Sequence, residues 1–379
     1  MYKNKLLTAL MMGLVMIGCQ PTAKKDANEG ELKLKLNGIQ VIGSHNSYKR
    51  PIEPALLKIL QEQTSKTFQG LQYGHIPLAD QLENHGLRNL EIDVLYDPDG
   101  GRFAKPYGLE LLKQQNIKAQ PYDPDGVMYD PGYKVLHVPD IDFRSTCLRL
   151  TDCLQQIKDW SDAHPRHLPI CITFNAKSEQ IDRPEFAKIL PFTPEAYDAL
   201  DREILTVFPK ERIVTPDDVR GEYETLDEAV RLMNWPEIDK VRGKVILVLD
   251  EKGQKMDDYV KGYPSLKGRL MFVLAAPGTP EAGFMIMNDP IANQDSIKKL
   301  VKAGYMVRTR ADADTEEARN GDYTKFKAAL SSGAHFITTD YYLEDKSFGT
   351  GYQIHLPGGS IARCNPIFVT EGCKAEALE

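Results

Sequence analysis

Two histidines follow apolar segments of this chain, in positions where catalytic groups often lie. The first segment ends in the run Gly-Ser-His-Asn-Ser-Tyr at 43–48, which carries His45 and Asn46. A later apolar segment ends at His137, and Asp140 and Asp142 follow it. Two histidines that face one site can divide general-base and general-acid roles in a displacement at phosphorus. Either histidine taken singly would be read as structural, so the prediction rests on the pair.

Oxygen-bearing side chains accompany these histidines. Glu91 and Asp93 stand two apart in an apolar segment, so they share one face of a strand. With the amide oxygen of Asn46 they form an all-oxygen set, which suits Ca²⁺, or less well Mg²⁺, better than zinc. The alternative is that both carboxylates form salt bridges with Arg88 or with the arginines of a later segment.

The segments that must position these groups read as a repeated strand and helix. Eight short apolar runs are typical of parallel strands buried on both faces, at 39–43, 89–95, 133–138, 169–175, 244–250, 270–275, 305–310 and 335–339. Helical patterns lie between them, at 51–68, 146–164, 195–207, 293–303 and 322–332, and Thr225 to Glu228 matches a capping box. This alternation predicts an α/β fold, a (β/α)₈ TIM-like barrel whose functional groups lie at the carboxyl ends of the strands.

Two connections are long for such a barrel. The loop at 96–132 follows strand two, and a mainly helical excursion at 176–243 follows strand four. The loop contains Asp-Pro-Asp-Gly at 97–100 and again at 123–126. Because the twelve-residue spacing of an EF-hand is absent, both are predicted to be turns.

The amino terminus has the pattern of an export signal. Lys3 and Lys5 precede an apolar run that ends in Met-Ile-Gly-Cys, which resembles a bacterial lipobox with Cys19 as the lipidated residue. A plain signal peptide with an incidental cysteine is the alternative. We expect a signal at 1–18, a lipidated polar tether at 19–36 and a single barrel domain at 37–379. No Asp follows Cys19, so the expected location is the cell envelope, with a lipid anchor in the outer membrane.

Charge and cysteines limit the class of protein further. The formal net charge is −7, and loss of residues 1–18 removes two lysines and no acid, which leaves −9. Such a chain lacks the basic surface of a nucleic-acid binder. Cys147 lies close to Cys153, and Cys364 to Cys373, so both pairs are disulfide candidates for an oxidising compartment. Cys171 lies within an apolar run and is read as a buried thiol.

Three stretches together resemble the bacterial calcium-dependent phosphoinositide-specific phospholipases C. They are Ser-His-Asn-Ser-Tyr at 44–48, Leu-Glu-Ile-Asp-Val at 90–94 and His-Val-Pro-Asp-Ile-Asp at 137–142, and the resemblance extends over nearly all of the chain after residue 38. It implies that His45 deprotonates the inositol 2-hydroxyl and that His137 protonates the departing diacylglycerol oxygen. It also implies that Ca²⁺ is held by Asn46, Glu91, Asp93 and Asn175, and that Lys177, Arg308 and Arg310 contact phosphate or inositol oxygens.

One departure from the family bears on the metal. The position of Asn175 often carries a glutamate ligand in the wider family, so this chain has one negative charge less and should bind Ca²⁺ more weakly. Two other functions stay open. A glycerophosphodiester phosphodiesterase is the first, although His-Asn-Ser stands here where those enzymes resemble His-Arg-Gly; a surface lipoprotein that binds inositol lipids or glycans without turnover is the second.

The negative charge also leaves the substrate open. It does not favour adsorption to anionic membranes, so the expected substrate is either an inositol phospholipid, including one from a host, or a soluble inositol phosphodiester. The sequence does not decide the oligomeric state.

Overall fold

The computed structural model describes residues 34–64, 68–368, 373–375 and 378–379. The predicted signal at 1–18, Cys19 and most of the predicted tether lie outside these residues. Leu34 and Leu36 are buried in the core, and Lys35 forms an isolated β-bridge with Glu237. The packed part of the chain therefore already includes residue 34, which corrects the predicted end of the tether at residue 36.

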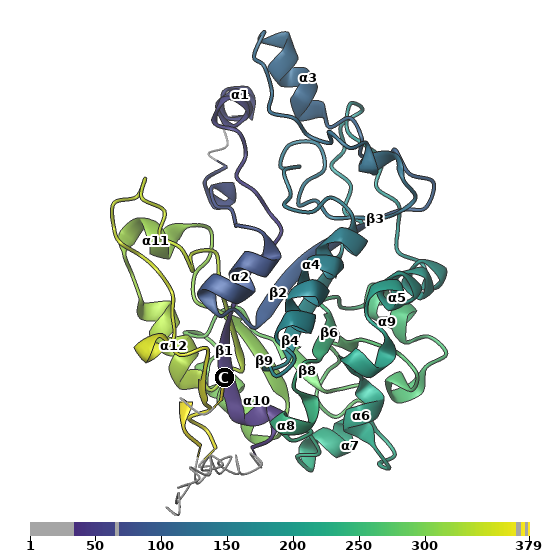
Figure 1. Ribbon diagram of the computed structural model, residues 1–379, viewed down its shortest axis with the longest axis vertical. Coiled ribbons are helices and arrows are strands. Elements are labelled where there is room, and N and C mark those ends of the chain that lie inside the picture. Colours follow the sequence, from purple (N-terminus) through teal and green to yellow (C-terminus); the bar gives the residue numbers. More distant parts are fainter. Residues whose placement is uncertain (1–33, 65–67, 369–372, 376–377) are drawn as a thin grey trace, which may run out of the picture. The chain divides into compact units, whose positions relative to one another are not determined.

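The described residues form a TIM-like barrel of parallel strands, as predicted (Figure 1). Adjacent strands pair in parallel, and the gap between β7 and β8 is spanned by one bridge, between Val273 and Ala282. In order around the barrel the strands are β1 (Ile39–Ser44), β2 (Asn89–Asp97), β4 (Ile170–Ala176), β6 (Val245–Leu249), β7 (Phe272–Val273), β8 (Phe284–Ile286), β9 (Met306–Arg310) and β10 (Phe336–Thr339).

One predicted barrel strand is wrong. The segment predicted at 133–138 contains β3 (Gly132–Lys134), which pairs antiparallel with the end of β2 and takes no place in the barrel. Its apolar residues Val135 and Leu136 are fully buried, but in the packing of a loop. An apolar run indicates that a segment is buried but not which segment it packs against. The sequence pattern therefore could not distinguish a barrel strand from a buried loop. The eighth place belongs to β8, which the prediction missed.

Two further strands extend the sheet at its margins. β5 (Ile213–Val214) pairs in parallel with the start of β6, and β11 (Ala362–Cys364) pairs antiparallel with β1. Both are only two or three residues long, too short to show a period in the sequence.

Helices connect the strands and cover the sheet. They are α1 (Pro54–Thr64), α2 (Leu78–His85), α3 (Tyr107–Gln114), α4 (Leu150–Ala163), α5 (Pro194–Val207), α6 (Pro216–Arg220), α7 (Leu226–Arg231), α8 (Ile238–Val241), α9 (Gln254–Val260), α10 (Gln294–Lys302), α11 (Glu316–Asn320) and α12 (Thr324–Ser332). The Thr193 hydroxyl caps α5 by accepting from the Ala196 N–H, and Thr225 caps α7 in the same way. A reciprocal capping box forms at Thr215, before α6, rather than at Thr225.

The long loop after β2 and the segment after β1 build a structure beyond the barrel. α1 and α3 share a small core that includes Leu56, Leu112 and Phe143, and Figure 1 shows both helices beyond the end where β2 runs into β3. Both Asp-Pro-Asp-Gly stretches are turns, as predicted, closed by hydrogen bonds from Gly100 to Asp97 and from Gly126 to Asp123. The excursion after β4 is mainly helical, also as predicted.

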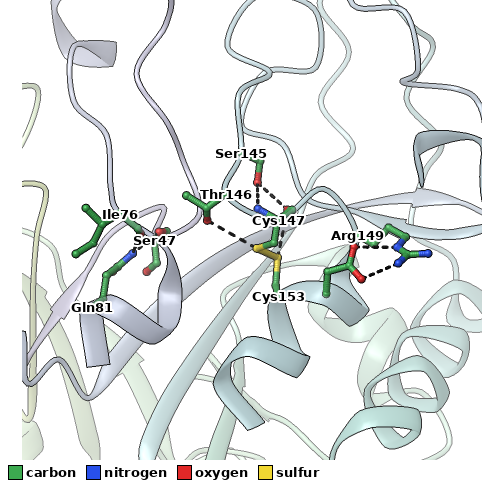
Figure 2. The surroundings of a disulfide bond; sticks show 9 residues. Ser47, Ile76, Gln81, Ser145, Thr146, Cys147, Arg149 and Cys153 are labelled. Carbon is green, nitrogen blue, oxygen red and sulfur yellow. Dashed lines mark hydrogen bonds and ion pairs between the residues drawn. A yellow bond between two sulfur atoms is a disulfide. The ribbon is translucent and has the colours of Figure 1, made fainter. Parts of the chain in front are cut away.

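Both predicted disulfides form, and Cys171 is a buried free thiol. Cys147–Cys153 fastens the segment after β3 to the first turns of α4 (Figure 2). Ser145 supports this disulfide: its hydroxyl donates to the Cys147 carbonyl at 2.7 Å. Within the ranges that the structure describes, no helix is both long and apolar enough to cross a membrane.

Candidate active site

The barrel strands bring their polar residues to one mouth. In the register of the sheet, Glu91 lies opposite Thr173 and Asp93 opposite Asn175, while Gly43 and Arg310 both lie opposite Thr338. Alternate residues of a strand face the same side, so these residues line the inside of the barrel. Glu91, Asp93 and Arg308 are each at most 2% exposed, and a buried charge at such a place needs a partner.

His45 follows β1 and forms a pair with the carboxylate that follows β10. Its Nδ1 lies 2.8 Å from Asp340 Oδ1, and Arg310 Nη2 donates to the other Asp340 oxygen at 2.6 Å. Burial raises the pKa of Asp340, but the positive charges of Arg310 and His45 outweigh it and lower that pKa overall. The ionised Asp340 favours the Nδ1–H tautomer, which places the lone pair of the neutral ring on Nε2, with Arg310 Nη1 3.4 Å away.

His137 forms a second pair of the same kind, but on a loop. Its Nδ1 lies 2.7 Å from Asp142 Oδ2, and Lys49 Nζ lies 3.4 Å from the same oxygen. Lys49 is fully buried and also donates to the Tyr73 carbonyl at 2.7 Å. The side chains of His45 and His137 are 19% and 17% exposed. Each ring is therefore bound to its carboxylate on one side and accessible to solvent on the other.

Several contacts join the two pairs. Glu91 Oε1 lies 3.7 Å from His45 Nε2 and accepts from the Asn175 amide at 3.2 Å. Lys177 Nζ lies 3.2 Å from Asp93, and Lys177 lines a cavity of about 140 Å³ together with His137.

Tyr73 makes a further connection between the two sides. Its hydroxyl accepts from the Asn46 amide at 2.7 Å, and Lys49 lies over its ring. The structure thus brings together the predicted site residues His45, Asn46, Glu91, Asp93, His137, Asn175, Lys177, Arg308 and Arg310.

The oxygen donors of the site suit a hard cation, but one of them, Glu91, is already paired with an arginine. Neither Asp93 oxygen has a hydrogen bond to a described residue, and Asn46 uses its amide nitrogen on Tyr73. The donors are oxygens only, which Ca²⁺ prefers. Arg308, however, pairs with Glu91, as the salt-bridge alternative foresaw, whereas Arg88 pairs with Glu379. Among the described residues no three His, Cys, Asp or Glu side chains form a metal cluster, so an ion here needs amide oxygens as well.

No role was predicted from the sequence for Asp142 and Asp340, the carboxylates behind the histidines. Asp340 directly follows a predicted strand and Asp142 follows His137 by five residues, so an acid near a strand end was the available signal. Asp312 lies behind Asp340 and accepts from the Asp340 N–H at 2.8 Å. Burial, assisted by Asp340, raises the pKa of Asp312. The pKa of Asp250 is raised to about 6, chiefly by burial and also by the charges of Glu91 and Asp93, against the charge of Arg308.

Comparisons with known proteins bear on the fold and on the family. Among solved structures, the chain resembles the calcium-dependent phosphoinositol-specific phospholipase C of a Pseudomonas species in its myoinositol complex, at 17% identity and a TM-score of 0.52, over 88% of this chain and 96% of that one. It also resembles the Ca²⁺-dependent phosphatidylinositol-specific phospholipase C of Streptomyces antibioticus, at 17% identity and a TM-score of 0.51, over 81% and 95% of the two chains.

At this identity the structures support the shared fold. No curated protein matches the chain. A family model, phosphoinositide phospholipase C, Ca²⁺-dependent, matches residues 34–366. The chain therefore belongs to the Ca²⁺-dependent phosphoinositide phospholipase C family.

Proposed function

We propose that this enzyme cleaves phosphatidylinositol-type phosphodiesters, and that the inositol 2-hydroxyl attacks phosphorus to give inositol 1,2-cyclic phosphate and diacylglycerol. The observation that carries the proposal is the presence of two separate histidine–carboxylate pairs, His45–Asp340 and His137–Asp142, where Glu91 lies beside His45 and Lys177 shares a cavity with His137. One base and one acid are what an in-line displacement of one alcohol by another requires.

The proton transfers are assigned to the Nε2 atoms of the two histidines, because each Nδ1 is bound to a carboxylate. His45 Nε2 takes the proton of the 2-hydroxyl as the new phosphorus–oxygen bond forms. His137 gives its Nε2 proton to the diacylglycerol oxygen as the old bond breaks. Each imidazolium is stabilised by the carboxylate on its Nδ1. Because the nucleophile belongs to the substrate, binding alone places it near phosphorus.

The ion and the basic residues act on the charge of the phosphate. Asn46, Glu91, Asp93 and Asn175 would hold Ca²⁺, which when bound neutralises negative charge on the phosphate and the 2-oxygen. Arg310 Nη1 lies 3.4 Å from His45 Nε2, and Lys177 lies beside His137, so both face the reacting groups. Arginine and lysine at these places suit contacts to phosphate or inositol oxygens.

The cavity beside His137 favours a lipid over a soluble diester. Its walls include Val138, Ile181 and Phe186. If His137 protonates the departing oxygen, the atoms next to that oxygen enter this cavity. The apolar walls stabilise an acylated glycerol there more than they stabilise free glycerol, although Lys177, Glu179 and Gln180 also line the cavity.

The decisive measurement is phosphorus NMR of phosphatidylinositol and glycerophosphoinositol incubated with the enzyme, with calcium and with chelator. We expect a cyclic inositol phosphate from phosphatidylinositol that needs calcium. Release of glycerol 3-phosphate from glycerophosphoinositol would replace the proposal with a glycerophosphodiester phosphodiesterase. Binding of either substrate without turnover would replace it with a binding lipoprotein.

We also propose that the chain is lipidated at Cys19 and anchored in the outer membrane of a bacterial envelope. The support is the basic and apolar pattern before Cys19 and the oxidised cysteine pairs. Radiolabelled palmitate should label the wild-type chain and not Cys19→Ser, and cell fractionation should then find only the variant in the soluble fraction.

A further inference from the structure

Three neighbouring strands place three side chains in one row at the barrel mouth. Asp93 on β2 lies opposite Asn175 on β4, and Phe174 on β4 lies opposite Leu249 on β6. The next residue after Leu249 is Asp250, whose N–H donates to the Phe174 carbonyl at 2.8 Å. In this register Asp250 lies beside Asn175. Adjacent strands lie about 4.8 Å apart, so Asn175 stands between two carboxylates.

The charges of the predicted donor set leave little attraction for a divalent cation. Glu91 pairs with Arg308, and Asp93 lies 3.2 Å from Lys177, so two negative charges face two positive ones. Asn46 and Asn175 add dipoles but no charge. Affinity for Ca²⁺ depends on the number of charged ligands, so a calcium site here needs another carboxylate.

Asp250 is placed to supply that charge. Its Oδ2 lies 3.9 Å from Arg308 Nη1, beyond a hydrogen bond, and its side chain is 20% exposed and so reachable from the mouth. Asp93, at the other end of the row, is 1% exposed and pairs with Lys177, whose Nζ lies 3.2 Å from Oδ2, while Oδ1 has no hydrogen bond to a described residue. A buried carboxylate oxygen without such a bond is stabilised when a ligand completes it.

We propose that Asp250 is a calcium ligand, which acts with Asp93 and Asn175 across the row and supplies the negative charge that Asn175 lacks. This inference rests on the proposed function, because it assigns the calcium of that same site. The carboxylate stands one strand further along the barrel than the family pattern would place it.

Calcium titration of the chelator-treated protein by calorimetry tests the assignment without any substrate. Asp250→Asn should weaken calcium binding at least about tenfold, as expected when one carboxylate leaves the shell. Asp257→Asn on the exposed side of α9 makes the same change in charge close by, and should leave the dissociation constant within about twofold because exposed charges are screened. Circular dichroism and Tm without calcium check that both variants fold.

A relocated charge gives an independent test. Asn175→Asp in the Asp250→Asn background should restore calcium binding to within about threefold of wild type, because it returns a carboxylate to the same row. Should Asp250→Asn fail to fold, Asn175→Asp alone should tighten binding in the wild-type chain. Unchanged affinity in Asp250→Asn, or no effect of Asn175→Asp, overturns the assignment.

The outcome is separable from that of the proposed function. If the wild-type enzyme needs calcium to form cyclic phosphate but Asp250→Asn binds calcium normally, only the ligand assignment fails. If no cyclic phosphate forms, the proposed reaction fails, while a weakened calcium isotherm in Asp250→Asn still establishes the ligand.

Discussion

The two histidine pairs are alike in chemistry and different in support. Each consists of an imidazole, a buried carboxylate and a cation: His45 with Asp340 and Arg310, and His137 with Asp142 and Lys49. The first is carried by barrel strands that hydrogen-bond to one another. The second stands on a loop after β3, which is fastened by a disulfide and by Lys49.

This difference shows two ways to hold an imidazole ring in place. A strand fixes a side chain through backbone pairing, whereas a loop needs cross-links and buried ion pairs to reach similar order. We therefore expect damage to the strand-borne pair to affect nucleophile and metal together, and damage to the loop-borne pair to affect mainly the leaving group.

The largest expected effects are on kcat, and they should distinguish the base, His45, from the acid, His137. His45→Ala and His137→Ala should each lower kcat on phosphatidylinositol by about 1,000-fold. On an inositol phosphodiester with a 4-nitrophenol leaving group, which departs without a proton, His137→Ala should recover to within about tenfold of wild type and His45→Ala should not. Equal recovery of both variants would show that the roles are not divided in this way.

The carboxylates behind the histidines come next. Asp340→Asn and Asp142→Asn should each lower kcat by about 100-fold, because each carboxylate orients and stabilises an imidazolium. Denaturant unfolding should show the larger loss for Asp142→Asn, about 3–5 kcal/mol, since it leaves the fully buried Lys49 without its carboxylate. Arg310 keeps Asp312 and Glu91 as acidic neighbours when Asp340 is replaced. A larger loss for Asp340→Asn would contradict this ranking.

The free energy of unfolding should fall at acid pH because of His75, which lies beside the strand-borne pair. His75 donates from Nε2 to the His45 carbonyl, and burial lowers the pKa of His75 to about 4. The unfolded chain binds this proton near pH 6.5 and the folded chain does not, so stability is lost as pH falls from about 6.5 to 4, by up to about 3 kcal/mol.

The measurement is the unfolding free energy against pH for the wild type and for His75→Gln, because the comparison cancels all other groups. The variant should have a smaller slope between these pH values. Parallel curves would mean that His75 takes up its proton in the folded state.

The smallest expected effect concerns the disulfide of the loop-borne side (Figure 2). Replacing both Cys147 and Cys153 by serine should cost about 2 kcal/mol of stability, as expected for so short a loop. It should lower kcat a few-fold and leave calcium affinity unchanged, because the oxygen donors lie on or just after barrel strands. Replacing Cys364 and Cys373 is the matched control, and its kcat should stay at the wild-type value.

The sequence predicted the strand ends better than the connections. His45 follows β1, whereas Glu91, Asp93 and Asn175 lie within the buried strands β2 and β4, and their convergence on one mouth follows from parallel pairing. The short β8 escaped prediction because its three residues are defined by pairing with β9. His137 was expected on a barrel strand, and only the antiparallel pairing of β3 with β2 shows otherwise.

Ion pairs were the least predictable part of the site. The pairing of Arg308 with Glu91 joins residues more than two hundred positions apart, and from the sequence it was only the alternative to a metal site. Asp340 and His45 are also far apart in the sequence, and nothing local indicates their pairing. Such contacts depend on barrel closure, which the strand pattern implies without specifying which side chains then meet.

The pairing of β1 has a consequence for biogenesis. β1 contacts β2 at a single register position but pairs along four residues with β10 and along three with β11. The strand that carries the first histidine is thus synthesised early and remains an open edge until the ribosome has delivered nearly three hundred further residues. An unpaired edge invites aggregation, so holdase chaperones should bind nascent chains that end before β10 far more than chains that extend past β11.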